Sequence, residues 1–184
     1  MSDSTEIKFC NIVKQRSSEN YNSFMMLHKN GLYGNCISIL RQELDSYLRI
    51  MYLLESDKKE LFISQTLAGL KWSYIKNGRK YNITDAIILN NIFDIQGWEK
   101  RVYDLGCAFI HLSNFHNYLL VNPFLSLSEN DKKSILQFIK DYHGIELQEL
   151  NINTIIPVLP LVMEKISKNL QCAVESILSP TNNS

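Results

Sequence analysis

The chain has 184 residues, of which 45% are hydrophobic and 21% are charged. A chain of this length buries roughly two-thirds of its unfolded surface, so one soluble domain can form without disulfides or a metal. Lys and Arg number 19, as do Asp and Glu, which leaves no overall field to attract nucleic acid or an acidic membrane. Any such partner must therefore be held by a local surface.

The first residues, Met-Ser-Asp-Ser-Thr-Glu, lack the basic start and the apolar run of a secretory signal, which predicts a cytoplasmic protein. The longest mostly apolar run, residues 155–163, contains two prolines and is too short to span a membrane, so no membrane partner is expected. Cys10, Cys36, Cys107 and Cys172 form no Cys-x-x-Cys pair, which argues against zinc or redox chemistry. We expect reduced, mostly buried thiols, no metal and no cofactor.

Apolar residues recur at spacings of three and four between few glycines and prolines, which predicts an all-α fold. No repeat or long linker divides the chain, so we expect one bundle of six to seven helices over residues 1–178, followed by a flexible tail at 179–184. The expected helices cover residues 5–26 (with a break near 17–18), 32–54, 58–72, 83–95, 98–112, 128–143 and 154–178.

Several of these helices have recognisable faces and ends. The second has an apolar stripe that would bury one face over about six turns: Ile37, Leu40, Leu44, Leu48 and Met51. The helix at 98–112 has a similar stripe: Val102, Leu105, Phe109 and Leu112. Residues that can cap N-termini stand at four helix starts: Ser56-Asp57, Thr84, Ser128 and Thr154. Pro157 fits the first turn of the last helix, and Asn77-Gly78 marks a loop.

The segment from Arg101 to Tyr118 gathers two of the four histidines beside Arg, Asp, Ser, Asn and Tyr side chains. Imidazole moves protons near neutral pH, and a nearby cation or amide can hold a phosphate meanwhile. His111 and His116 could therefore share acid–base work. In the structural alternative, His111 is a half-buried histidine of the bundle, and His116 and Tyr118 are surface groups that cover its end.

The relation between the two histidines depends on where the helix ends. Four residues lie within roughly 80° of one another and form a polar flank beside the apolar stripe: Arg101, Asp104, Ala108 and His111. We therefore expect His111 at the edge of the core. In an unbroken helix His111 and His116 would point about 140° apart, but Ser113 and Asn114 favour local hydrogen bonds that loosen the helix.

This pattern resembles a known family. A long helix that ends in Tyr, Asp, a small residue and Phe-x-His-x-Ser is similar to the HEPN superfamily of bacterial helical domains, over roughly residues 31–178 by helix order. Many members are metal-independent ribonucleases of toxin–antitoxin, phage-defence and CRISPR systems. The resemblance implies a homodimer that binds RNA or a nucleotide, with an antitoxin or a nucleotidyltransferase as a partner, and it implies RNA cleavage.

The family's catalytic pattern is an arginine, four to six residues, a histidine and sometimes x-Tyr. The closest match runs from His111 to Tyr118 and has a histidine where the arginine should be. Because a neutral imidazole cannot clamp phosphate as a guanidinium does, activity would require Arg101 or a partner chain's arginine. The resemblance implies His116 or His111 as general base or acid. Arg101 and Asn114 would then stabilise the phosphorane.

A second feature is the segment from Lys71 to Tyr81, which has three aromatic residues and no acidic residue. Its four cations are Lys71, Lys76, Arg79 and Lys80. Cations can contact phosphates while aromatic rings stack on bases, the combination that single-strand binders use. Alternatively, Trp72 and Tyr74 pack the end of the third helix, and the charges solvate a loop.

Two other functions stay open. A non-catalytic helical interaction or regulatory module is favoured by the neutral charge and by the missing arginine. A small-molecule-binding bundle is the third alternative, although no residue points specifically to it. The chain has no P-loop, dinucleotide-binding, zincin or diiron motif.

Overall fold

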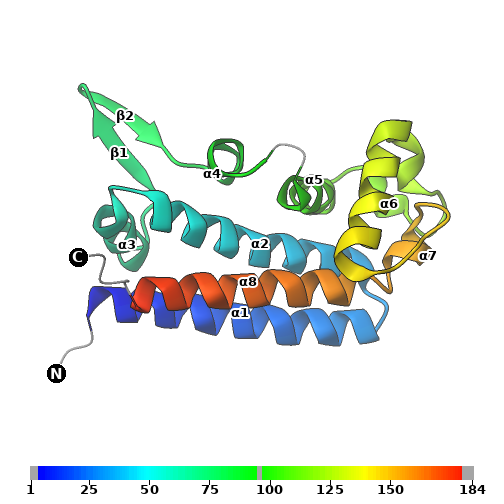
Figure 1. Ribbon diagram of the computed structural model, residues 1–184, viewed down its shortest axis with the longest axis horizontal. Coiled ribbons are helices and arrows are strands. Elements are labelled where there is room, and N and C mark those ends of the chain that lie inside the picture. The colour runs from blue at the N-terminus through cyan, green and yellow to red at the C-terminus, as the bar shows by residue number, and fades with distance from the viewer. Residues whose placement is uncertain (1–3, 95–96, 180–184) are drawn as a thin grey trace.

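The computed structural model describes residues 4–94 and 97–179 (Figure 1). It confirms the all-α helical bundle, because 72% of the described residues are helical and the sheet that they form has only two strands. The expected tail lies outside the described residues except for Ser179, which ends the last helix. Ile95, expected at the end of the fourth helix, also lies outside them.

The described residues form eight α-helices, more than the six to seven expected. They are α1 (Thr5–Lys29), α2 (Tyr33–Glu55), α3 (Lys59–Leu67), α4 (Asp85–Ile92), α5 (Trp98–Ile110), α6 (Glu129–His143), α7 (Ile152–Ile155) and α8 (Leu159–Leu178). Two 3₁₀ helices are η1 (Asn114–Asn117) and η2 (Pro123–Ser126), and the hairpin strands are β1 (Ser73–Lys76) and β2 (Arg79–Asn82). Thr84 and Ser128 cap α4 and α6 as predicted.

The body of the molecule consists of α1, α2 and α8, which lie side by side (Figure 1). Helix α2 is central, because α1 and α8 pack on one side of it and α4 and α5 on the other. Its predicted stripe is buried except for Met51, which is half-buried, and Leu44 and Leu48 have no exposed surface. Residues outside the stripe, such as Tyr47 and Leu53, are buried too, as a helix covered on both sides requires. Helices α6 and α7 lie at the end of the body where α1 leads into α2 (Figure 1).

Helix α1 is continuous, so the break expected near residues 17–18 is wrong. The polar residues there face a buried carboxylate rather than interrupt the helix. Glu43 of α2 has no exposed surface and accepts hydrogen bonds from the Ser17 hydroxyl, from Asn20 Nδ2 at 2.9 Å and from Ser167 Oγ at 3.1 Å. These three donors come from α1 and α8 and satisfy Glu43 within the core.

On the opposite side of α2, an ion-pair cluster joins it to α4. Asp85 accepts hydrogen bonds from Arg49 and, at 3.2 Å, from Arg41, and Arg49 also pairs with Asp45 at 3.2 Å. The Arg41 guanidinium lies 4.0 Å from the ring centre of Tyr103 on α5. Burial raises the pKa of Asp45 to about 6, and a hydrogen bond with Asp85 acts in the same direction. Burial also acts to raise the pKa of Asp85, but Asp45 and the arginines lower it on balance.

Helix α3 ends at Leu67 rather than at Trp72 as expected. Gly69 adopts a φ of 69°, a left-handed conformation that stops the helix. The chain then folds back, and Trp72 is buried with its ring 5.0 Å from that of Phe62. Its Nε1 donates to Thr66 Oγ1 at 2.7 Å. Trp72 therefore packs the end of α3, as the structural alternative for this residue predicted.

The start of the last helix also differs from the expectation. Thr154 is not its cap but the third residue of the short helix α7, where it forms a reciprocal capping box with Asn151. Pro157 lies between α7 and α8, and Pro160 occupies the first turn of α8 instead. Two prolines three residues apart remove two backbone donors, which suits a break followed by a new helix start.

All four cysteines are free, but only Cys10 and Cys36 are buried. Cys107 is half-buried and Cys172 is exposed, so the expectation of mostly buried thiols holds for two of the four. Across residues 4–94 and 97–179, no helix has the length and hydropathy that crossing a bilayer would require.

Candidate functional site

The residues that include His111 and His116 follow directly after the end of α5. Ile110 is the last residue of α5 and His111 is its C-cap, so the helix ends two residues before the expected end at residue 112. His111 is exposed rather than at the edge of the core. Leu112 is 96% exposed, which contradicts its expected place in the buried stripe. The physical reason is that the 3.6-residue period of the stripe stops with the helix, two residues before Leu112.

His116 lies in η1 and is held by the backbone of Ser113. Its Nδ1 is 3.3 Å from Ser113 N and 3.2 Å from Ser113 O, so this nitrogen contacts the backbone in either tautomer. The ring also lies 5.7 Å from that of Phe109. His116 is exposed, which leaves Nε2 as the nitrogen suited to contact a substrate.

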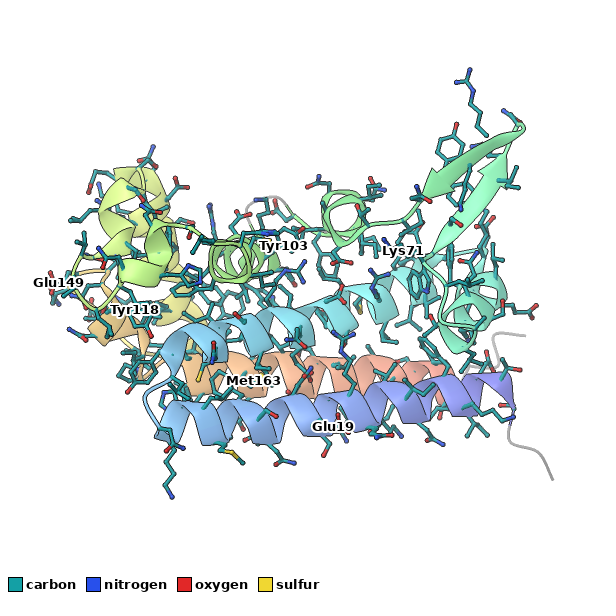
Figure 2. The ribbon with its side chains drawn as sticks, turned by 180° about the vertical axis from the view of Figure 1, so that it is seen from behind. Glu19, Lys71, Tyr103, Tyr118, Glu149 and Met163 are labelled. Carbon is teal, nitrogen blue, oxygen red and sulfur yellow. The ribbon has the colours of Figure 1, made fainter. Side chains whose placement is uncertain are left out.

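Tyr118 connects this segment to the central helix. Its hydroxyl accepts a hydrogen bond from the backbone of Gly34 at 3.4 Å, and its ring packs 5.8 Å from that of Phe109. Figure 2 shows Tyr118 beside the start of α2. Asn114 begins η1 and is exposed. Tyr118 thus has a structural role, whereas Asn114 and the two histidines are exposed to solvent.

Arg101 lies at the other end of α5. Its Nη1 donates to Asp131 of α6 at 3.1 Å. Ten residues separate Arg101 from His111, which corresponds to about 15 Å along a helix. One chain therefore does not bring Arg101 together with His111, and the expected polar flank extends along α5 instead of forming a cluster. The catalytic roles stay a prediction that needs an arginine from a second copy.

The segment from Lys71 to Tyr81 contains a β-hairpin rather than the expected loop. Asn77 and Gly78 have φ values of 51° and 74°, the conformation of the tight two-residue turn that Asn-Gly favours. Figure 1 shows β1 and β2 projecting beyond the helices. The Asn-Gly pair was the only sequence signal for a hairpin. The strands themselves are four residues long and lack the alternation of apolar and polar residues that identifies strands.

The register of the two strands determines which side chains share a face of the hairpin. Tyr74 pairs with Tyr81, and Lys76 pairs with Arg79; because cross-strand partners share a face and alternate residues do too, these four lie on one face. We call them the aromatic-cationic face. Ile75 and Lys80 pair on the opposite face.

The aromatic-cationic face is accessible and has no acidic residue nearby in sequence. The Tyr74 and Tyr81 rings stack with centres 5.3 Å apart, and Lys58 Nζ lies 5.3 Å from the Tyr74 ring centre. Tyr81 is 42% exposed. Lys71 lies at the base of the hairpin (Figure 2). No Asp or Glu occurs between residues 61 and 84, but Asp57 pairs with Lys58 at 2.6 Å. The positive charge of this face therefore comes from Lys76 and Arg79.

Sequence reasoning missed a third feature, the segment of residues 105–128, which contains no Asp, Glu, Lys or Arg. We call it the uncharged segment. Six of its apolar side chains are largely exposed: Ile110, Leu112, Leu119, Leu120, Val121 and Leu125. The absence of charged residues was visible in the sequence. The exposure of the apolar side chains could not be predicted, because it depends on α5 ending at Ile110.

Within residues 4–94 and 97–179, no group of three or more His, Cys, Asp or Glu side chains could hold a metal ion. No family model, curated protein or solved structure matches the chain.

Proposed function

We propose that the protein binds single-stranded RNA on the aromatic-cationic face of the hairpin. The observation that supports this proposal most directly is the strand register, which places Tyr74 and Tyr81 on the same face as Lys76 and Arg79. Aromatic rings stack on bases of any sequence, and cations beside them contact the phosphates. The two-residue turn fixes this spacing before RNA binds, so little conformational entropy is lost on binding.

The local charge fits this proposal better than the net charge does. Four cations lie between Lys71 and Lys80, and the nearest acidic residues in sequence are Glu60 and Asp85. Binding that neutralises phosphates releases counterions, so affinity falls as salt rises. Because the rest of the chain carries four more acidic than basic residues, RNA binding should depend on the hairpin.

The experiment measures fluorescence anisotropy of a labelled 12-nucleotide oligouridylate over a range of salt concentrations. Lys76→Gln combined with Arg79→Gln should weaken binding roughly tenfold at low salt and reduce the slope of log affinity against log salt by about 1.4, since each single-strand phosphate contact contributes about 0.7. Lys29→Gln with Lys133→Gln removes the same charge from exposed sites on α1 and α6 and should change neither value. Equal weakening in both double variants would contradict a hairpin site.

The resemblance to HEPN domains supports a further part of the proposal, a cytoplasmic homodimer of a toxin–antitoxin or phage-defence system that cleaves RNA, with an antitoxin or a nucleotidyltransferase as its partner. In that reaction the 2′-hydroxyl attacks the adjacent phosphate and the 5′-oxygen leaves, with His116 and His111 as base and acid. An arginine from the second copy, such as Arg101, would stabilise the phosphorane.

Cleavage is tested with purified protein and single-stranded RNA in EDTA, where 2′,3′-cyclic phosphate ends are expected. His116→Ala should lower the rate by roughly a hundredfold. His111→Arg restores the family's charge and spacing and should keep or raise the rate. If the wild type and His111→Arg both fold as dimers and neither cleaves RNA, the catalytic proposal is wrong. That result would not bear on RNA binding by the hairpin.

A second candidate function, a non-catalytic interaction module, is favoured by the uncharged segment. Interface cores are depleted of charged residues and enriched in large apolar ones. Contiguous exposed apolar surface on a soluble domain commonly marks a contact with another macromolecule. Leu112 and Leu120 are 96% and 84% exposed, so their burial against a partner would be strongly favourable.

A further inference from the structure

A pocket of about 360 Å³ lies between α2, α5, α6 and the start of α8. Its walls are apolar and include residues from six elements: Leu40, Leu105, Phe115, Phe124, Ile135 and Val162. Only Arg101, Asp104 and Asp131 bring charge to the lining. Small-molecule sites are typically such concave, mostly apolar spaces with a few fixed polar groups.

The charged residues lie at the solvent end of the pocket. Side chains of Asp104 and Asp131 are 51% and 43% exposed, whereas the apolar wall residues Phe124 and Leu159 are almost fully buried. The pocket therefore has an apolar interior and a polar rim. A matching ligand is amphipathic, with its apolar part inside and its polar group at the rim.

At the rim, both carboxylates already have cationic partners. Lys100 pairs with Asp104, and Arg101 Nη1 donates to Asp131 at 3.1 Å. The Ser128 hydroxyl and Arg101 together hold the pKa of Asp131 below its usual value. A cationic ligand group would have to displace one of these pairs.

The Arg101 guanidinium has further N–H donors besides the one that Asp131 accepts. Asp131 engages Nη1, which leaves the guanidinium edge formed by Nε and Nη2, and Nε is buried without a hydrogen-bond partner among the described residues. A buried donor without a partner is costly, so an acceptor that reaches Nε through a shift of the Arg101 side chain is favoured. Two donors on one edge match the two oxygens of a carboxylate.

We propose that this pocket binds a linear monocarboxylate of about eight to ten carbons, with its chain among the apolar walls and its carboxylate on the free edge of Arg101. The volume supports this size, since about 30 Å³ per water-sized group gives about twelve non-hydrogen atoms. This ligand site goes beyond RNA binding and does not rest on it. The ligand would contact Phe115 and Phe124, so it would also pack against part of the uncharged segment.

The test is isothermal titration calorimetry of the full chain with octanoate and, separately, with 1-octanol, which has the same chain but no charge. Octanoate should bind one to one and more tightly than 1-octanol. Arg101→Gln should weaken octanoate binding roughly tenfold or more, because a charge-assisted hydrogen bond is lost, and should leave 1-octanol binding within about twofold. Arg101→Lys keeps the charge but loses the two-donor edge and should recover only part of the affinity.

Two further variants locate the site. Ala108→Phe places a ring in the pocket and should abolish binding of both compounds, whereas Lys133→Gln removes an exposed charge elsewhere on α6 and should change neither. Circular dichroism confirms folding of each variant. The proposal is overturned if folded wild type does not bind octanoate, if 1-octanol binds as tightly, or if folded Ala108→Phe still binds.

Discussion

Gly106→Ala tests the closest approach between helices α2 and α5. A Cβ added at Gly106 would lie 2.5 Å from Arg41 Cβ and 2.9 Å from its Cγ and Cδ. Arg41 Cβ is fixed to the α2 backbone, so a change of side-chain rotamer cannot relieve this contact. The two helices must move apart, and the Arg41 guanidinium would then shift from Tyr103, now 4.0 Å away, and from Asp85 at 3.2 Å.

The magnitude follows from two opposing effects. Overpacking in a well-packed interior costs about 1–3 kcal/mol, and a contact between two backbone-anchored carbons belongs in the upper part of that range. Alanine is favoured over glycine in a helix by about 1 kcal/mol. The net loss of unfolding free energy is therefore about 1–2 kcal/mol, which lowers Tm by about 2–8 °C in a chain of this size.

The assay is thermal unfolding followed by circular dichroism at 222 nm. Gly34→Ala in helix α2 is the matched control. A Cβ at Gly34 would lie 3.4 Å from Tyr118 Cε1, which is close to ordinary contact, so the Tm of this variant should not fall. A Tm for Gly106→Ala equal to or above that of wild type would refute the close packing of α5 on Arg41.

Two more predictions concern pH and association. Burial raises the pKa of Asp45 from its ordinary value of 3.8 to about 6, so the stability that Asp45 contributes is full below pH 3.8 and is lost as pH rises through about 6. In urea titrations, the unfolding free energy of Asp45→Asn relative to wild type should therefore increase between pH 4 and pH 7.5. A difference that does not change with pH would contradict this pKa. Light scattering should give twice the 21.4 kDa chain mass for wild type, and Leu119→Ser with Leu120→Ser should give monomers while Ile75→Ser on the hairpin stays dimeric. A monomeric wild type would exclude self-association through the uncharged segment.

Much of the fold could be predicted from local patterns. The stripe from Ile37 to Met51 identified α2, and side-chain caps at Thr84 and Ser128 placed two helix starts correctly. The sequence did not show that α2 is covered on both sides, because a stripe reports only its most apolar face. The break expected in α1 was wrong because the partner of its serine, Glu43, comes from another helix.

The candidate site was less predictable, for geometric reasons. A helical projection placed Arg101 and His111 on one flank, but angle around a helix says nothing about the distance of about 15 Å along it. The hairpin face required the register, which depends on the Asn77-Gly78 turn. The pocket near Arg101 arises from packing of elements far apart in sequence, and no local pattern encodes it.

The most direct measurement of the central claim is photocrosslinking of single-stranded RNA that carries 4-thiouridine, followed by mass spectrometry of the linked peptides. Stacking on Tyr74 and Tyr81 brings bases into contact with the hairpin, so the account predicts crosslinks within residues 72–82, and their loss when Lys76 and Arg79 are both changed to Gln. Crosslinks confined to residues 110–125, or unchanged by the double variant, would contradict binding on the aromatic-cationic face.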